Sequence, residues 1–383
     1  MRSDRLGFWR NVRIIACAML LAAACGFAGC GDDDDGSPTG GNDDNIVPLI
    51  DSVRVSVPVT APADTVEVRC YARDGDGDAM QYTWQAEDGA IVGGGSAVKW
   101  VAATGNRSHS INVTVADGNG GTAVSDTAIE VMEGTFLVQT GDGLVAIGAR
   151  GESFVLSPST AFVEVLGTRI FMKGSHGIRE LDHTGAEIGR IDIDDPTVSG
   201  YDFAMLPSGG FAFASNESDS VAFMGPNGAV EAQVEMPNPS DDNLQNVDGL
   251  VVGSRLILSE NGNNELLAFD LNTHEASVFR SFPNWGGWLG AIDYDGGLFY
   301  LCGGRVIRRF SETGEPEDVA TLPQGNITGI VVVGNYAYAV VNFEGTLHRI
   351  DTRTGADEIL VRELGYPQDI EHLPVRLQPP PNR

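Results

Sequence analysis

Leu347-His348-Arg349-Ile350-Asp351-Thr352-Arg353-Thr354-Gly355 is the stretch of sequence that decides the fold. It is typical of a short strand that ends in an aspartate and a Thr-Gly turn. The same phrase, with substitutions, occurs at Ile178–Gly185, Val221–Gly228, Leu266–His274 and Val306–Gly314. The last residues of successive copies lie 43, 46, 40 and 41 positions apart, and each step has room for four strands. A unit of this size cannot bury both faces alone, so the period predicts sheets packed around an axis, as in a β-propeller.

The two ends of the repeat region complete each other. Three strands are expected near its start, at 135–140, 144–149 and 153–156, and one strand is left over after the last copy, at 368–373. Joined in one sheet, they would remove two strand edges that otherwise promote aggregation. Residues 135–375 number 241, which is about 40 for each of six units. We therefore predict an all-β protein in which 135–375 form a six-bladed propeller closed by the C-terminal strand, with a disordered tail at 376–383.

The repeat resembles the blades of bacterial NHL-like propellers, in which the third strand ends in an aspartate followed by a Thr-Gly turn. Asp182, Asp270 and Asp351 match that aspartate, whereas Gly225 and Ser311 replace it in the other two copies. At the level of the fold, the prediction is also similar to the six-bladed gluconolactonase and regucalcin family. That resemblance implies a metal ion in the central channel.

A second series of short alternating segments precedes the repeats, between Ile50 and Val131. Six or seven strands in roughly 80 residues are typical of a β-sandwich. Cys70–Asp78, Tyr82-Thr83-Trp84 and Val113–Gly121 resemble, in this order, the PKD-type and related Ig-like modules of bacterial surface proteins. The resemblance implies an Ig-like sandwich at 49–133, with Trp84 as a core residue between its sheets.

The sandwich contains a candidate calcium site. Asp74, Asp76 and Asp78 alternate with glycine, and Asp117 from a neighbouring turn is a fourth candidate oxygen ligand for Ca²⁺. An EF-hand is excluded because its twelfth position, counted from Asp74, is Gln85. The alternative is a tight turn, in which glycine supplies positive φ and aspartate accepts backbone hydrogen bonds.

The N-terminus has the pattern of an export signal. Four arginines among residues 1–13 precede an apolar run at 14–24, which is too short for a comfortable membrane span. Phe27-Ala28-Gly29-Cys30 resembles the lipobox of bacterial lipoprotein precursors, and the resemblance implies cleavage of a signal peptide at 1–29 and lipidation of Cys30, with Cys25 as a competing site. Residues 30–48 are rich in Asp, Gly and Ser and predict a flexible tether. The expected location is the cell envelope, with a lipid anchor in a membrane, most simply the outer membrane facing the periplasm or the cell surface.

The net charge limits the classes of expected partner, and the cysteine content bears on disulfide formation. A formal net charge of −29 repels phosphate backbones, so nucleic-acid binding is not expected and cationic partners are favoured. Outside the leader and Cys30 only Cys70 and Cys302 remain, in different expected domains, and both are interpreted as buried thiols rather than as a disulfide.

No catalytic signature is present: the sequence contains no Gly-x-Ser-x-Gly, His-Glu-x-x-His or Walker motif. Propellers usually bind ligands at the mouth of the central channel, where the loops that enter the inner strands converge. Aligning these loops brings Asp202, Asp248 and Asp369 into equivalent positions, with Gly290 and Thr328 in two others. Three like charges at one axis favour a bound metal ion, amine or basic peptide. The alternative is that these aspartates cap strand backbones around solvent.

A Trp-rich loop is the second candidate binding element. Trp285 and Trp288 are flanked by glycines in Pro283–Trp288, and Tyr201 and Tyr366 occupy equivalent loops. Their rings are candidates for stacking on a sugar or an aromatic group. The alternative is packing of the tryptophans between adjacent blades.

From these patterns we expect a lipid-anchored envelope protein that displays a propeller and binds a protein, peptide or glycan without catalysis. The competing hypothesis is a metal-dependent hydrolase of lactone or ester type, in which channel aspartates hold the ion that activates water.

Overall fold

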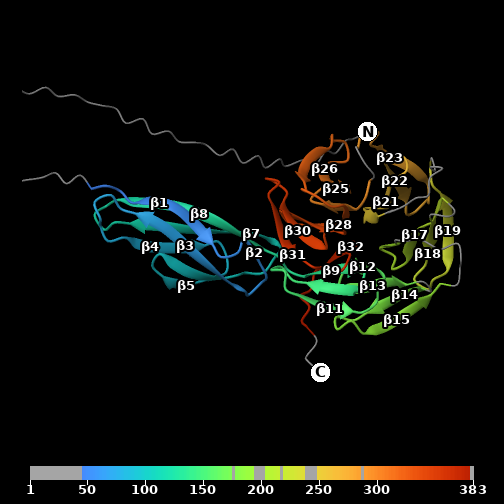
Figure 1. Ribbon diagram of the computed structural model, residues 1–383, viewed down its shortest axis with the longest axis horizontal. Helices are drawn as coiled ribbons and strands as arrows, with labels where there is room; N and C mark the ends of the chain where they lie inside the picture. The colour runs from blue at the N-terminus through green and yellow to red at the C-terminus, as the bar shows by residue number, and fades with distance from the viewer. Residues whose placement is uncertain are drawn as a thin grey trace, which may run out of the picture. The chain divides into compact units, whose positions relative to one another are not determined.

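The structure is a computed structural model that describes residues 45–379, apart from 175–176, 194–202, 216–218, 238–247 and 286–288. Every regular element in this part of the chain is a β-strand (Figure 1). The expected signal peptide, Cys30 and most of the tether lie outside the described residues. Across the described ranges, the structure contains no helix of the length and apolar character needed to cross a bilayer.

The N-terminal domain consists of two four-stranded sheets, ordered β1-β3-β6-β5 and β2-β8-β7-β4. Its strands are β1 (Leu49–Val55), β2 (Val59–Thr60), β3 (Thr65–Arg73), β4 (Gln81–Ala86), β5 (Ala90–Gly94), β6 (Ala97–Val101), β7 (Arg107–Ala116) and β8 (Thr122–Val131). In β3 the side chains of Val66, Val68 and Cys70 are buried while their neighbours are exposed, as the alternation of a half-buried strand requires. Trp84 packs against the buried side chains as expected, and its indole nitrogen donates to the Gly95 carbonyl oxygen at 2.9 Å.

The C-terminal domain consists of four-stranded blades, and the described residues contain six of them. Blade 1 comprises β32 (Asp369–Leu373), β9 (Thr135–Thr140), β10 (Gly143–Ile147) and β11 (Ser153–Ser157). Blade 2 comprises β12 (Phe162–Leu166), β13 (Arg169–Gly174), β14 (Gly177–Leu181) and β15 (Glu187–Asp192). Blade 3 comprises β16 (Phe203–Met205), β17 (Phe211–Ser215), β18 (Ser220–Met224) and β19 (Val230–Glu235). Blade 4 comprises β20 (Gly249–Val252), β21 (Arg255–Glu260), β22 (Glu265–Asp270) and β23 (Ala276–Ser281). Blade 5 comprises β24 (Ile292–Asp295), β25 (Leu298–Gly303), β26 (Val306–Phe310) and β27 (Glu317–Thr321), and blade 6 comprises β28 (Ile327–Val333), β29 (Tyr336–Val341), β30 (Thr346–Asp351) and β31 (Asp357–Val361).

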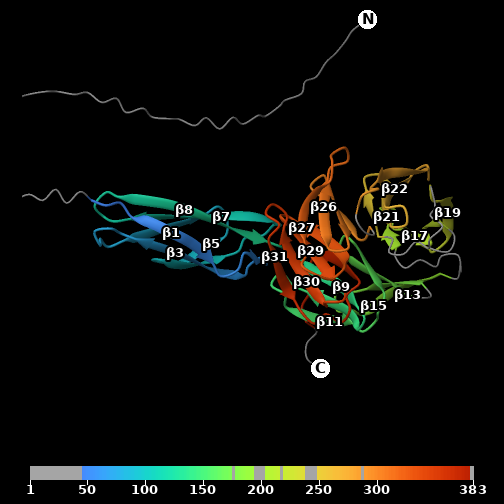
Figure 2. The ribbon, with the colours of Figure 1, turned by 45° about the horizontal axis from the view of Figure 1, so that its top comes forward.

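The innermost strands of the blades contact one another in a cycle, in the order β12, β16, β20, β24, β28, β32 and back to β12. Figures 1 and 2 show the blades following one another in chain order around this cycle. Six hydrophobic clusters each draw buried side chains from two neighbouring blades, including one shared by blades 6 and 1. Each blade therefore depends on both of its neighbours for burial, which is the physical reason for the repeat.

The C-terminal strand pairs with the first strand of the repeat region, as the sequence predicted. β32 runs antiparallel to β9, with Asp369 opposite Gln139 and Leu373 opposite Thr135. The chain then continues along this blade, and the Leu377 amide donates to Thr135 Oγ1 at 2.8 Å. Leu377 is buried in the cluster shared by blades 1 and 2, so the start of the expected disordered tail at 376 is wrong. The packed chain extends at least to this leucine because its apolar side chain finds a buried site.

The repeated aspartate holds the turn that follows it. Asp351 Oδ1 accepts hydrogen bonds from the backbone amides of Arg353 and Thr354, at 2.8 and 3.2 Å. Gly355 then adopts a φ of 72°, in the left-handed region that glycine tolerates at little cost. In the copy that ends in His274, the histidine takes a φ of 59° instead, a conformation that costs a non-glycine residue about 1–2 kcal/mol. The aspartate and the glycine of the motif thus both stabilise the turn.

Candidate functional site

A cavity of about 250 Å³ lies among the innermost strands, at the centre of the cycle of blades. Residues from β12, β16, β24, β28 and β32 and from the start of β20 line it. Five of the lining residues are acidic: Glu164, Asp248, Asp293, Asp369 and Glu371. Within the described part of the chain, no Lys, Arg or His lines this cavity. We call these five residues the channel acids.

Three channel acids lie at or near the starts of their inner strands. Asp248 directly precedes β20, Asp293 is the second residue of β24 and Asp369 is the first residue of β32. Asp248 Oδ2 accepts a hydrogen bond from the Ile292 amide at 2.7 Å, and Asp293 Oδ2 accepts one from the Val332 amide at 2.5 Å. These aspartates therefore connect blade 4 to blade 5 and blade 5 to blade 6.

Asp369 makes a different kind of contact from Asp248 and Asp293. Its Oδ1 atom accepts a hydrogen bond from the amide of the next residue, Ile370, at 2.7 Å. This bond stays within one strand and connects no neighbouring blade. Among the three aspartates, the hydrogen bond of Asp369 is thus the one that stays within its own strand.

Burial and the nearby charge of Asp248 make Asp293 and Asp369 hard to ionise. Burial raises the pKa of Asp293 to about 7, and the nearby Asp248 carboxylate adds to the increase. Burial likewise raises the pKa of Asp369 to about 7, again with a contribution from Asp248. A positive charge placed in the cavity would favour the ionised forms of all three carboxyls, so the site is suited to a cation.

The structure brings two of the three candidate channel aspartates together. Asp248 and Asp369 line the same cavity, and Asp202 lies outside the described residues. Gly290 and Thr328 do not line the cavity, and the Thr328 hydroxyl instead donates to the Pro367 carbonyl oxygen at 3.1 Å.

Glu164, Asp293 and Glu371 were missed because the alignment considered only the loops that enter the strands. Glu164 offered a signal, since it is a carboxylate within the otherwise apolar strand Phe162–Leu166. The strands of Asp293 and Glu371 contain further polar residues, so these two acids did not stand out.

The Trp-rich loop packs between blades in its described part. Trp285 is 6% exposed and contributes to the hydrophobic cluster of blades 4 and 5. Its ring meets Phe282 edge-on at 5.3 Å between centroids, and the Arg308 guanidinium lies 4.5 Å from its centroid. An exposed stacking platform at Trp285 is therefore wrong, because the indole is covered by these neighbours. Trp288 and Tyr201 lie outside the described residues.

Tyr366 is the member of the predicted aromatic set that is exposed in the structure. It is 47% exposed and packs edge-on against Phe343, which is 74% exposed, with 5.7 Å between the ring centroids. Phe343 follows β29, and Tyr366 precedes β32 by three residues. The pair shows apolar surface beside the strand that carries Asp369.

The candidate aspartates Asp74, Asp76 and Asp78 of the N-terminal domain lie close together, and their main visible role is to form a hydrogen-bonded turn. Oxygen atoms of Asp74, Asp76 and Asp78 lie within 4.8 Å of one another. Asp74 Oδ1 accepts backbone hydrogen bonds from Asp76, Gly77 and Asp78 at 3.1–3.2 Å, whereas its Oδ2 is buried without a hydrogen-bond partner among the described residues. The neighbouring Asp76 raises the pKa of Asp74.

Asp117, the proposed fourth ligand, is 4% exposed and already engaged. Its carboxylate accepts hydrogen bonds from Asn45 Nδ2 at 2.8 Å and from the amides of Asn119 and Gly121 at 2.7 and 2.9 Å. These bonds account for its burial without an ion. The three clustered aspartates fit an oxygen-ligated cation better than Asp117 does.

Comparison with solved structures shows the β-propeller fold. A chain in the nidogen/laminin complex matches with a TM-score of 0.51 and 9% identity, over 62% of this chain and 97% of that chain. A streptogramin B lyase matches with a TM-score of 0.45 and 16% identity, over 62% of this chain and 87% of that chain. No protein family matches the sequence, and no curated protein matches it either. At these identities the likeness concerns the fold alone.

Proposed function

We propose that this protein is a lipid-anchored cell-envelope binding module, in which an Ig-like stalk presents a six-bladed propeller to a partner with a positive centre. The partner is a protein or peptide whose basic side chain enters the acidic channel. The cyclic contacts of the inner strands and the pairing of β32 with β9 support the six-bladed ring. The two sheets of the N-terminal domain, with one shared core, support the stalk.

The observation that carries the proposal is the charge of the channel. Asp248, Asp293 and Asp369 line one cavity of about 250 Å³, and its described lining residues include acids but no Lys, Arg or His. Carboxylates that repel one another across a site of low dielectric constant lower their free energy by binding a cation. An ammonium or guanidinium group also has the hydrogen-bond donors that carboxylate oxygens accept.

The surface beside the channel suits a macromolecular partner. Tyr366 of this exposed pair precedes β32, which begins with Asp369, and Phe343 from the turn between β29 and β30 packs against it. Aromatic side chains are enriched in protein interfaces. A basic side chain in the channel and apolar contacts with this pair would act together.

The second candidate function is metal-dependent hydrolysis of a lactone or ester. The same carboxylates favour it, since oxygen ligands suit hard divalent cations and a bound ion activates water. In this case the ion, rather than a partner side chain, neutralises the channel acids.

The experiment compares cations directly on the full-length protein purified in detergent with a chelator. Calorimetric titrations use Ca²⁺, Mg²⁺, Zn²⁺ and an Arg- and Lys-containing peptide library, with Asp369→Asn as the channel variant and Asp126→Asn as the control. Asp126 is an exposed aspartate of β8 and does not line the channel. The proposal expects a basic peptide to bind the wild type and the control about tenfold or more tightly than the channel variant, as for loss of a charged hydrogen-bond partner. Stoichiometric metal binding without peptide binding would support the hydrolase instead, and equal binding to all three proteins would refute both.

The anchor is tested separately. Metabolic labelling with palmitate should mark the wild type, and Cys30→Ala should abolish the label. A labelled Cys30→Ala protein would move the lipidated residue to Cys25.

A further inference from the structure

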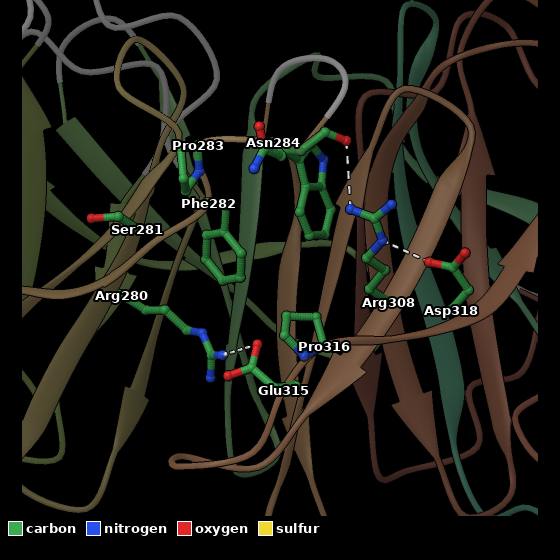
Figure 3. Close-up of a pocket in the computed structure, with 10 residues that line it drawn as sticks. Arg280, Ser281, Phe282, Pro283, Asn284, Arg308, Glu315, Pro316 and Asp318 are labelled. Atoms are coloured by element: carbon green, nitrogen blue, oxygen red, sulfur yellow. Dashed lines mark hydrogen bonds and ion pairs between the residues drawn. The ribbon is translucent and has the colours of Figure 1, made fainter.

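A groove of about 480 Å³ lies between blades 4 and 5, apart from the channel. It is formed by the end of β23, the segment that follows it, β26, and the turn into β27. Figure 3 shows Arg280 with Glu315 on one side and Arg308 with Asp318 on the other, and Phe282, Pro283 and Pro316 among the groups between them. None of its lining residues is a channel acid.

Arg280 is held in place by aromatic rings rather than by its acidic partner. Its guanidinium carbon lies 4.9 Å from the Phe310 centroid and 5.6 Å from the Phe282 centroid, and its Nη1 donates to the Gly314 carbonyl oxygen at 2.5 Å. The ion pair with Glu315 is loose, at 3.6 Å, and the Glu315 side chain is 94% exposed. The guanidinium is therefore fixed while the carboxylate beside it is open to a ligand.

On the other side of the groove, Arg308 is also held by an aromatic ring and lies next to a carboxylate. Its guanidinium carbon lies 4.5 Å from the Trp285 ring centroid, and its Nη1 donates to the Trp285 carbonyl oxygen at 3.5 Å. Nε donates to Asp318 Oδ1 at 2.6 Å, and the Asp318 side chain is 67% exposed. The groove thus presents two guanidinium groups on rigid supports, each next to an accessible carboxylate.

Each arginine of the groove offers hydrogen-bond donors, and the carboxylate beside it offers acceptors. This arrangement suits a ligand in which each polar group can both donate and accept a hydrogen bond. Guanidinium groups only donate, and carboxylates only accept. A sugar hydroxyl does both, so a pair of neighbouring hydroxyls can contact an arginine and its carboxylate together. Pro283 and Pro316 offer apolar surface to the C–H face of a sugar ring, and Asn284 and Ser281 add further hydrogen-bonding groups. The volume lies within the range of small-molecule sites, about 300–1,000 Å³.

We propose that this groove binds a neutral sugar unit of an oligosaccharide. The two arginines and two acids give it a formal charge of 2 − 2 = 0. An anionic ligand would meet Glu315 and Asp318 in the groove and, at longer range, a chain with a net charge of −29. A cationic ligand would meet both guanidinium groups. An uncharged polyol avoids both conflicts.

The test uses an array of neutral and acidic oligosaccharides and the full-length protein in detergent, followed by calorimetric titration of the bound sugars. Glu315→Gln is the main variant, because this exposed side chain has little to contribute to folding. Glu317→Gln is the matched control: it carries the same change two residues away, and Glu317 pairs with Arg309 outside the groove. Arg280→Gln is a third variant, with its fold checked by circular dichroism.

The proposal expects binding of neutral oligosaccharides that weakens about tenfold in Glu315→Gln and is unchanged in Glu317→Gln, as for loss of one charged hydrogen-bond acceptor. A folded Arg280→Gln should lose binding at least as severely. Binding of acidic sugars alone, strengthened by Glu315→Gln, would overturn the proposal in favour of an anion site. A folded wild type that binds no sugar of the array, or equal affinity in Glu315→Gln and the wild type, would overturn it as well. Because the variants leave the channel acids intact, failure here does not affect the cation test of the proposed function.

Discussion

Replacement of Asp369 by asparagine should make the free energy of unfolding fall less steeply as the pH rises. Burial raises the pKa of this carboxyl from 3.8 to about 7, so the folded protein holds its proton where the unfolded chain has lost it. Between these two values, each pH unit removes about 1.4 kcal/mol from the free energy of unfolding of the wild type. The asparagine does not titrate, and its Oδ1 can still accept the hydrogen bond from the Ile370 amide.

The magnitude follows from that slope. Between about pH 5 and pH 7, deprotonation of Asp369 should cost the wild type about 2–3 kcal/mol of stability that Asp369→Asn does not lose. The assay is urea unfolding of the full-length protein at several pH values in the presence of a chelator. Asp126→Asn is the control, and its free energy of unfolding should depend on pH as that of the wild type does. A cation that binds the channel should reduce the difference in pH dependence between the wild type and Asp369→Asn near pH 7. Parallel profiles for wild type and Asp369→Asn would refute the reasoning, since they would mean that this carboxyl is not perturbed by the fold.

Three further predictions concern other parts of the chain. Trp285→Ala should lower the free energy of unfolding by about 3–5 kcal/mol in urea titrations, because it empties a buried site between blades; a loss below about 1 kcal/mol would mean that the ring is not packed as described. Asp74→Ala should lower the Tm of the N-terminal domain even with a chelator present, because three backbone amides lose their acceptor; a Ca²⁺-dependent rise in Tm that disappears in Asp76→Ala would instead assign the cluster to calcium. Truncation after Gly365 should give an aggregating product in light scattering, because β9 loses its partner β32; a stable monomer would show that this pairing is dispensable.

The sequence was informative wherever one physical requirement repeats. The step of about forty residues reflects blades that need two neighbours for burial, and the leftover segment 368–373 could pair only with an incomplete blade. Both patterns predicted the observed pairing. The repeated aspartate and Thr-Gly turn could be read correctly as local structure, since the hydrogen bonds of Asp351 span only a few residues.

The site was less predictable because it depends on which side chains meet across blades. Asp293 has no distinctive local pattern, and it joins the channel acids only because β24 starts beside the Val332 amide of the next blade. The sequence left open whether Trp285 is an exposed platform or packs between blades, and the structure shows its ring covered by Arg308 from β26. The two guanidinium groups of the groove are likewise invisible in the sequence, since their aromatic supports come from separate strands.

The pairing of the first and last strands also sets an order of events during biosynthesis. The ribosome completes β9 at Thr140, and β32 begins only at Asp369, so almost the whole domain must be translated before β9 gains its partner. Contacts so distant in sequence slow folding. Until β32 has been synthesised, the nascent chain therefore carries an incomplete ring in which one edge of β9 is unpaired.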